Sequence, residues 1–322
     1  MMQFYQKRNF GTIVSDTFTF FKENGKNYFK NYIFINGLLL ILMVVIFVFG
    51  YRELFSQILG SNTGGQNYYF QAYFEENRFM LALVSVLVFI LFLLVTAVSY
   101  SYPILYLKRL SETGNKDIKA DELLRDLKNN SGRFLKLFLG LVFVVTPLAM
   151  LVIGISYVLV FLLIGFFLLI LVMPTLMNVV NFLMFDYFHT RKGFFESLSY
   201  ALRSQFSYPN TNEKSPFWKY WGSTVIMYLI IQVIVSVFTA IPMIFIFVKM
   251  YTIQQGSGVQ ENPLAGPMGI LFFVIYGVSL LVSFLMMNFL FVSSGLQYYD
   301  SRTDLHRKVG FTEIDTIGTY EG

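Results

Sequence analysis

The sequence predicts an all-α polytopic membrane protein with six transmembrane helices, and three observations support this. First, 56% of the 322 residues are apolar and only 13% are charged, whereas about 25% are charged in a soluble domain. Second, Phe134–Phe185 contains one charged side chain, Lys136. Since about 20 residues cross a bilayer, this stretch is long enough for two crossings, and we expect the turn at Gly154-Ile155-Ser156. Third, most Lys and Arg lie in alternate segments between the apolar runs, as expected when successive runs cross a membrane.

The apolar runs define a single membrane domain over residues 1–300, followed by a polar cytoplasmic tail over 301–322. The first run begins near Tyr32 and has no Ala-x-Ala cleavage pattern after it, so we interpret it as a retained span and not as a signal peptide. We expect Arg52–Arg78 to form a polar loop. The six predicted spans cover about residues 31–51, 79–107, 134–153, 157–185, 220–248 and 267–296.

The basic residues predict the orientation in the membrane. With six spans, 21 of the 24 Lys and Arg fall on the side of the N-terminus, and only Arg52, Arg78 and Lys249 fall on the other. Basic residues collect on the cytoplasmic side of membrane proteins. We therefore expect a multi-pass protein of the cell (inner) membrane with both termini in the cytoplasm.

Three amphipathic cytoplasmic helices are predicted from apolar residues at helical spacing. They lie near Phe10–Phe21, with a break at Gly25 and Asn27, near Asp117–Leu127, with Asp117 as N-cap, and near 194–206. Each precedes aromatic and basic residues at a membrane boundary, so we hypothesise a threefold helix-plus-hairpin repeat. The alternative is that such residues collect at any interface. The predicted interface anchors are Lys30, Phe134, Lys136, Trp218 and Lys219.

Composition also excludes several kinds of site. The chain has no Cys and two His, which excludes disulfides, thiolate sites and a His-rich metal centre, and we expect no cofactor. The spans carry almost no ionisable groups, which argues against ion-coupled transporters, voltage sensors and intramembrane proteases. Anionic lipid headgroups account for the cytoplasmic basic excess, so nucleic acid is not needed as a partner.

Two groups of residues are candidates for a functional site. Uncharged polar side chains inside the spans either line a polar path or form hydrogen bonds between helices, and we favour the second interpretation. His189 with Asp186 is a candidate general base. No nucleophile or metal cluster accompanies this pair, and a solvated interfacial histidine is the better interpretation. The candidate polar residues of the membrane interior are Asn178, Asn181, Gln232 and Asn288.

Two stretches carry a family resemblance. Phe194–Ser204, followed by Phe217-Trp218-Lys219 at the start of a span, resembles the membrane domain found with glycerophosphoryl diester phosphodiesterases and in its stand-alone six-span relatives. Leu296–Arg302 resembles the close of that domain, and the layout is similar over most of the chain. The resemblance implies a bacterial cytoplasmic-membrane protein of poorly defined role. It implies no phosphodiesterase activity, because catalysis in that family belongs to an attached barrel domain.

The leading hypothesis from the sequence is a non-enzymatic membrane protein. It would act through the lipid bilayer or a membrane-protein partner, in envelope organisation or membrane-protein assembly. The second hypothesis is a transporter or channel for a small or lipid-like substrate, based on proline-interrupted spans and uncharged polar residues. A membrane-embedded enzyme comes third.

Overall fold

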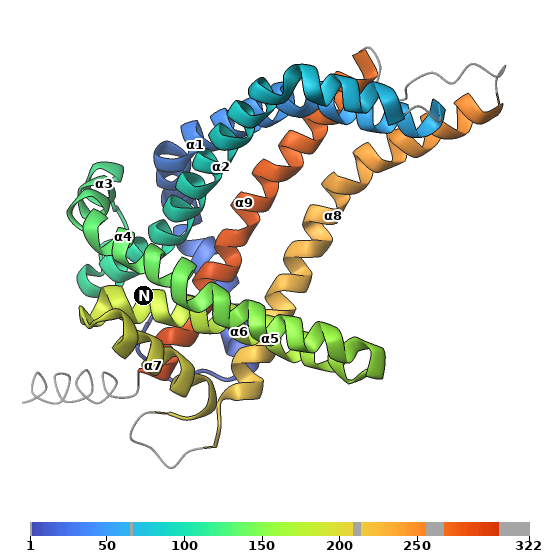
Figure 1. Cartoon of the computed structure of the whole chain (residues 1–322). Coiled ribbons are helices and arrows are strands. Elements are labelled where there is room, and N and C mark those ends of the chain that lie inside the picture. The colour runs from blue at the N-terminus through green and yellow to red at the C-terminus, as the bar shows by residue number, and fades with distance from the viewer. Residues whose placement is uncertain (1, 65–66, 209–213, 256–266, 303–322) are drawn as a thin grey trace, which may run out of the picture. The chain divides into compact units, whose positions relative to one another are not determined.

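The computed structural model describes residues 2–64, 67–208, 214–255 and 267–302. Every regular element in these ranges is helical. The elements are α1 (Phe10–Gly64), α2 (Asn67–Thr113), α3 (Ala120–Asn129), α4 (Ser131–Gly140), the π-helical turn η1 (Leu141–Val145), α5 (Thr146–Val158), the 3₁₀ turn η2 (Leu159–Leu162), α6 (Ile164–Thr190), α7 (Phe194–Phe206), α8 (Phe217–Gln255) and α9 (Pro267–Ser301) (Figure 1).

Within the described ranges, six helical stretches are long and apolar enough to cross a membrane, which agrees with the predicted number. Each contains an 18-residue window of mean hydropathy between 2.2 and 3.1 with at most two charged residues. They are Phe10–Gly50, Gln71–Thr113, Ser131–Leu162, Ile164–Thr190, Phe217–Phe245 and Gly269–Ser301. The structure therefore describes an all-helical, multi-pass membrane protein.

The chain divides into two compact units, which we describe separately. Unit 1 comprises Met1–Tyr32, Tyr100–Leu229 and Asn288–Gly322, and unit 2 comprises Ile33–Ser99 and Ile230–Met287. Helices α1, α2, α8 and α9 contribute to both units, whereas α3 to α7 belong to unit 1. The single membrane domain over 1–300 stays a prediction.

Buried tyrosines form much of the core of unit 1. Tyr28, Tyr102 and Tyr106 are almost completely buried, and their rings meet edge-on or tilted at centroid distances of 4.8 to 5.9 Å. The Tyr28 hydroxyl donates to Asn288 Oδ1 at 2.8 Å, and the Tyr102 hydroxyl donates to the Tyr28 carbonyl at 2.6 Å. Buried phenols need hydrogen-bond partners, and these contacts link α1, α2 and α9.

Unit 2 is held mainly by apolar packing and close helix approach. Val48 and Phe273 are buried against each other. A Cβ added at Gly277 would lie 2.6 Å from Val44 Cγ1, so α9 approaches α1 closely at this glycine. Small residues permit such approaches between membrane helices.

The hairpin of the third and fourth predicted spans turns later in the chain than predicted. Helix α5 continues through Gly154-Ile155-Ser156, and the chain reverses over η2 and Leu163, whose φ is 62°. Gly154 costs an interior helix about 1 kcal/mol, but opening the backbone within hydrocarbon costs several kcal/mol per unpaired group. Ser156 instead satisfies its hydroxyl inside the helix, donating to the Val152 carbonyl at 2.8 Å.

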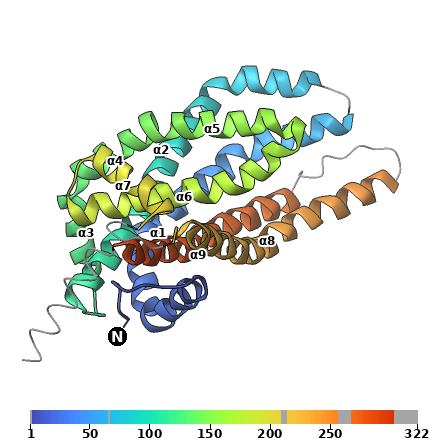
Figure 2. The ribbon, with the colours of Figure 1, turned by 90° about the horizontal axis from the view of Figure 1, so that it is seen from below.

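The glycine that the turn requires is Gly165. A Cβ there would lie 2.0 Å from the Ser156 carbonyl oxygen, so only glycine lets the start of α6 pack against the end of α5. Figures 1 and 2 show that α5, which precedes this turn, and α6, which follows it, run side by side.

Two other predicted breaks are also wrong. Helix α1 runs through Gly25 and Asn27, because Asn27 Nδ2 donates to the Ile118 carbonyl at 3.1 Å and so makes a tertiary contact instead of a local turn. The predicted loop over 52–78 is largely helical, with α1 ending at Gly64 and α2 beginning at Asn67, while residues 65–66 lie outside the described ranges. No proline interrupts residues 52–78, so the chain can stay helical beyond the bilayer.

Short helices stand at two of the three positions where amphipathic helices are predicted. In α3 the N-cap is Lys119 and not Asp117, and Leu123 is buried. In α7 the buried residues are Ser197, Ala201, Ser204 and Gln205, while Leu202 and Phe206 of the predicted apolar stripe are exposed. The interfacial role of these helices and the threefold repeat stay predictions.

Candidate functional site

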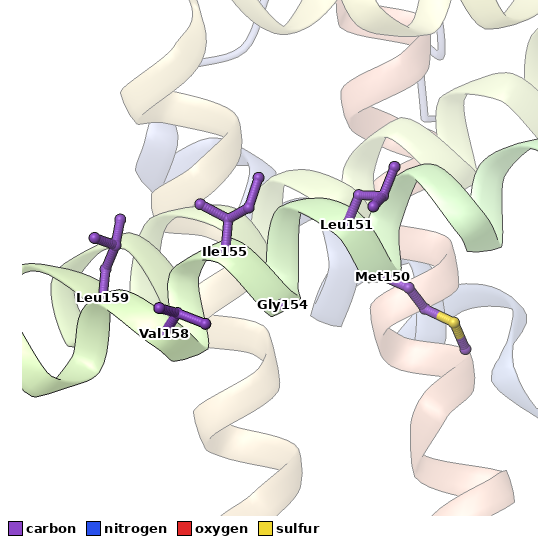
Figure 3. A pocket seen from close by; sticks show the side chains of 6 residues that line it. All are labelled: Met150, Leu151, Gly154, Ile155, Val158 and Leu159. Atoms are coloured by element: carbon purple, nitrogen blue, oxygen red, sulfur yellow. The ribbon is translucent and has the colours of Figure 1, made fainter.

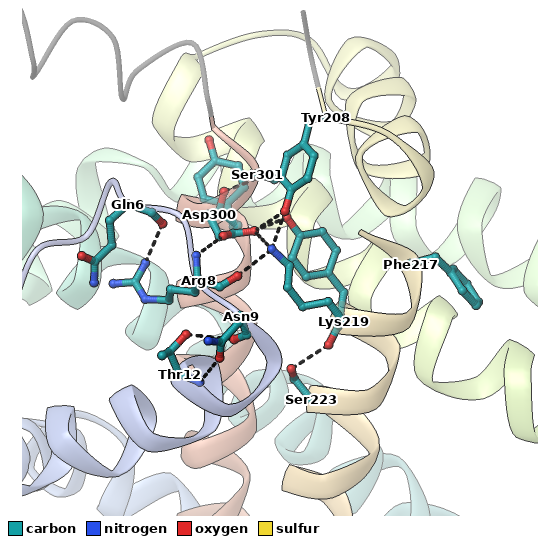
Figure 4. A network of polar contacts seen from close by, with 12 residues as sticks. Gln6, Arg8, Asn9, Thr12, Tyr208, Phe217, Lys219, Ser223, Asp300 and Ser301 are labelled. Atoms are coloured by element: carbon teal, nitrogen blue, oxygen red, sulfur yellow. Dashed lines mark hydrogen bonds and ion pairs between the residues drawn. The ribbon is translucent and has the colours of Figure 1, made fainter. Parts of the chain in front are cut away.

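A buried carboxylate, Asp300, is the centre of a polar network in unit 1 (Figure 4). Its side chain is inaccessible to solvent. Oδ1 accepts the backbone N–H of Arg8 at 2.5 Å, and Oδ2 accepts from Lys219 Nζ at 2.5 Å and from the Tyr220 hydroxyl at 2.6 Å. The Tyr208 hydroxyl donates to Oδ2 at 3.3 Å. Four donors thus converge on one acid at the end of α9.

The same network holds the N-terminal segment in place. Lys219 Nζ also contacts the Arg8 carbonyl at 2.9 Å and the Tyr208 hydroxyl. The buried Arg8 guanidinium pairs with Asp16 at 2.8 Å and donates to the Phe4 carbonyl at 2.8 Å. A carboxylate with this many charge-assisted hydrogen bonds is satisfied as a structural group. The arrangement links the N-terminal segment, α8 and α9.

A second buried carboxylate, Asp186, lies near the end of α6. Arg302 Nη1 approaches Asp186 Oδ1 to 3.3 Å and donates to the Tyr298 hydroxyl at 2.7 Å. The Thr190 hydroxyl also contacts this acid, at 3.4 Å from Oδ2. The pair between Asp186 and Arg302 links the end of α6 to the end of α9.

His189 is therefore not paired with Asp186. Its Nδ1 lies 2.9 Å from the Phe185 carbonyl oxygen, which can only accept, so Nδ1 must carry the proton. In the neutral ring, Nε2 then accepts from the Tyr299 hydroxyl at 2.8 Å, and that oxygen lies 3.1 Å from Ser111 Oγ. Both ring nitrogens are thus occupied by structural contacts. Among the described residues no hydrogen bond joins His189 to Asp186, and the Nε2 lone pair that a general base would use is engaged by Tyr299.

Three of the four polar residues predicted in the membrane interior form buried contacts between helices of unit 1. Asn178 Oδ1 accepts from Thr224 at 2.6 Å, and Gln297 Nε2 donates to the same threonine hydroxyl at 3.1 Å. Asn181 Nδ2 donates to Ser294 Oγ at 3.2 Å, and Asn288 accepts from Tyr28. Gln232, in contrast, is exposed on α8 in unit 2.

The five predicted interface anchors lie in different surroundings. Lys30 and Lys136 are exposed, and Trp218 is 66% exposed. Phe134 is half-buried, with its ring centroid 4.2 Å from that of Phe188. Lys219 makes the contacts with Asp300 described above, so it also has a structural role that its boundary position does not reveal.

Sequence reasoning missed Asp300 and Arg302 as organising residues. The signal that points to them is their position, because they are the first charged residues after the long uncharged stretch Pro267–Tyr299. Such residues are usually assigned to solvent at the end of a span. Their burial becomes evident only when the N-terminal segment and α8 are placed beside α9.

In the described part of the chain, no group of three or more His, Cys, Asp or Glu side chains is arranged to hold a metal ion. Comparisons with protein-family models, with curated proteins and with solved structures found no match. The resemblance to the membrane domain of glycerophosphoryl diester phosphodiesterases stays a prediction.

Proposed function

We propose that the chain is a non-catalytic integral protein of the cytoplasmic membrane that acts through protein or lipid partners, in envelope organisation or membrane-protein assembly. The observation that carries this proposal is the exposure of the apolar stretch Ser131–Leu162, which forms the first arm and the turn of the hairpin α5–α6. In Ser131–Leu162 only 6% of the most apolar window is buried, compared with 28% in Ile164–Thr190. Phe143 is 72% exposed and Phe161 is 93% exposed. Such a surface must be covered by lipid or by another membrane helix.

The hairpin also carries an apolar groove that suits a helix partner (Figure 3). The groove has a volume of about 410 Å³ and is lined by Met150, Leu151, Gly154, Ile155, Val158 and Leu159. Apart from the neighbouring residues and backbone of its own helix, no described atom lies within 4 Å of a Cβ built at Gly154. A glycine in an open apolar groove allows close approach of a second helix, as at small-residue contacts between membrane helices. This favours a membrane-protein partner at the hairpin.

The buried polar groups support a structural role as well. Asp186, Asp300 and His189 are each engaged by side chains or carbonyls of neighbouring elements. An active site needs a group that is within reach of a substrate, and these three groups serve instead to connect helix ends.

The proposal is tested by isolating the tagged full-length protein in mild detergent and identifying bound proteins and lipids by mass spectrometry. We expect a stoichiometric membrane-protein partner that Gly154→Leu removes, because the leucine fills the groove. Gly132→Leu is the matched control, since Gly132 also has open space around its Cβ but lies outside the groove. If the wild-type protein retains neither a protein nor a distinct lipid class, the proposal is wrong.

Transport of a small or lipid-like substrate is the second candidate. One observation favours it: Asn178 Nδ2 and Gln297 Oε1 are both buried and have no hydrogen-bond partner among the described residues. A donor and an acceptor around the same threonine suit a water or a small polar molecule. A reproducible small molecule bound to the purified wild type, released by Asn178→Leu, would move the assignment to transport.

A further inference from the structure

A polar cavity in unit 1 shares no lining residue with either carboxylate network. It has a volume of about 320 Å³ and is enclosed by the last turns of α2, by α3, by the first turn of α4 and by the end of α6. Four cationic side chains line it: Lys108, Arg109, Arg133 and Arg191. The acids in its lining are Glu112 and Asp126. The lining therefore has a net positive charge.

The two lining carboxylates lie beside Arg109 and Lys108. The positive charge that they do not offset is therefore at Arg133 and Arg191. Arg109 is already paired, with Asp126 at 2.9 Å and with Glu122 at 3.1 Å. Lys108 lies 4.0 Å from Glu112. Arg133, in contrast, donates to two neutral carbonyls, those of Tyr187 at 2.6 Å and Lys192 at 3.2 Å. Neutral acceptors orient a guanidinium but do not cancel its charge.

Donor capacity toward a ligand remains in this cavity. Both hydrogen bonds of Arg133 use Nη2, while its guanidinium lies 4.2 Å from the Tyr187 ring centroid, so its plane is fixed. A guanidinium has five N–H donors. The side chain of Arg191 is exposed and has no hydrogen bond or ion pair with the described residues. The fixed guanidinium of Arg133 and the exposed guanidinium of Arg191 together are suited to bind the oxygens of a phosphate group.

The cavity also lies at one boundary of the apolar spans. Lys108 follows the apolar run of α2, Arg133 precedes that of α4 and α5, and Arg191 follows that of α6. The basic residues of the chain are concentrated on this side of the spans, and anionic lipid phosphates attract basic residues at a membrane surface. Phe188 adds an apolar wall to the cavity, and Leu135 of α4 is exposed nearby in sequence.

We propose that this cavity binds the phosphate group of an anionic lipid at the cytoplasmic boundary, through Arg133 and Arg191 with Lys108 beside them. This deepens the proposed function by naming a ligand class, and it rests on that function only in assuming that the chain acts in the membrane. A free phosphate has the same chemistry, and the experiment distinguishes the two sources.

The experiment measures lipid binding to the full-length protein in detergent by native mass spectrometry. The probes are dioleoyl phosphatidylglycerol, dioleoyl phosphatidylcholine and inorganic phosphate. We expect phosphatidylglycerol to bind in preference to phosphatidylcholine, and Arg133→Gln with Arg191→Gln to weaken its binding by about tenfold, as loss of charge-assisted contacts implies. We expect inorganic phosphate at millimolar concentration not to displace the lipid.

The matched control is the double variant Lys136→Gln with Lys192→Gln. Both side chains are exposed at the same boundary and neither lines the cavity, so this variant removes the same charge from the surface alone. We expect it to change phosphatidylglycerol binding less than about twofold. An equal loss in both double variants would overturn the proposal, since surface charge would then suffice.

A third variant guards against misfolding. Arg133 caps carbonyls near the end of α6, so its loss could disturb the helix end, whereas Arg191→Gln alone removes no described contact. If Arg191→Gln binds phosphatidylglycerol as the wild type does, the proposal is wrong. If millimolar inorganic phosphate displaces phosphatidylglycerol from the protein, the site binds a soluble anion and the lipid assignment is wrong. A cavity that binds no probe, in a protein that still retains a partner, would overturn this proposal alone and leave the proposed function standing.

Discussion

Unit 1 buries two carboxylates, Asp186 and Asp300, each in contact with a cation, whereas the polar contacts described in unit 2 join uncharged groups. In unit 2, Asn36 Nδ2 donates to Ser99 Oγ at 2.7 Å, and Ser279 Oγ donates to the Phe238 carbonyl at 2.9 Å. The difference follows from the sequence, because the charged residues flank the apolar runs. Unit 1 contains most of the charged helix ends, and unit 2 is built mostly from the apolar parts of the helices.

The comparison shows that the two units use different means of fixing helix positions. A buried ion pair fixes the relative position of the two helices that carry it, since breaking the pair leaves an uncompensated buried charge. Packing around small residues sets the distance between two helices, and a substitution there produces a steric clash or a void. Each means can be tested by a substitution that removes it.

The largest effect is expected at Asp300. Asp300→Ala leaves Lys219 and the Tyr220 hydroxyl without their buried acceptor, so we expect the protein to lose about 3–5 kcal/mol of stability. The measurement is thermal unfolding of the purified protein in detergent. Asp300→Asn, which keeps acceptor capacity, should lose less, and an alanine variant as stable as the wild type would refute the structural role.

An intermediate effect is expected at Gly277 in unit 2. A Cβ there meets Val44 Cγ1 at 2.6 Å and Val48 Cγ2 at 3.3 Å, and the stiff valine side chain cannot rotate away easily. We expect Gly277→Ala to destabilise the protein by about 1–3 kcal/mol. The control is Gly154→Ala, which has open space and should be neutral or slightly stabilising because alanine favours helix. Equal melting temperatures for both variants would contradict the close packing.

The smallest effect is expected for an exposed ion pair of unit 1. Lys116 Nζ lies 2.8 Å from Glu23 Oε2, nearly as close as the pair at Asp300, but both partners are accessible to solvent. Exposed pairs contribute about 0.2–1 kcal/mol. Lys116→Ala should therefore shift the melting temperature far less than Asp300→Ala does. A comparable shift would mean that distance matters more than burial in this protein.

Much of the fold could be predicted because hydrophobic periodicity and length reflect local physics. The number of spans and the all-helical class follow from the apolar runs, since hydrocarbon forces the backbone to satisfy its own hydrogen bonds. The turn at Leu159–Leu163 could not be predicted, because Gly154 and Ser156 are the stronger local turn signals. Its position depends on the contact between Gly165 and the Ser156 carbonyl.

The candidate sites show the same limit more sharply. Asn178, Asn181 and Asn288 were predicted as polar interior residues, and the structure places all three in buried contacts. The contact between Arg8 and Asp300, however, joins residues that lie 292 positions apart. The periodicity and spacing of the sequence carry no information about such a pair. Its burial arises only when the N-terminal segment, α8 and α9 pack together.

By itself, the sequence predicted six helices that are long and apolar enough to cross a membrane, which the described structure contains, and an orientation in which most basic residues lie on one side. Each of these depends on the transfer of side chains and backbone from water to hydrocarbon, which acts residue by residue. Only the tertiary structure decided which boundary charges are buried as ion pairs, such as Asp300, and which line an open cavity, such as Arg133 and Arg191. That distinction depends on which groups surround each charge, and those groups come from distant parts of the chain.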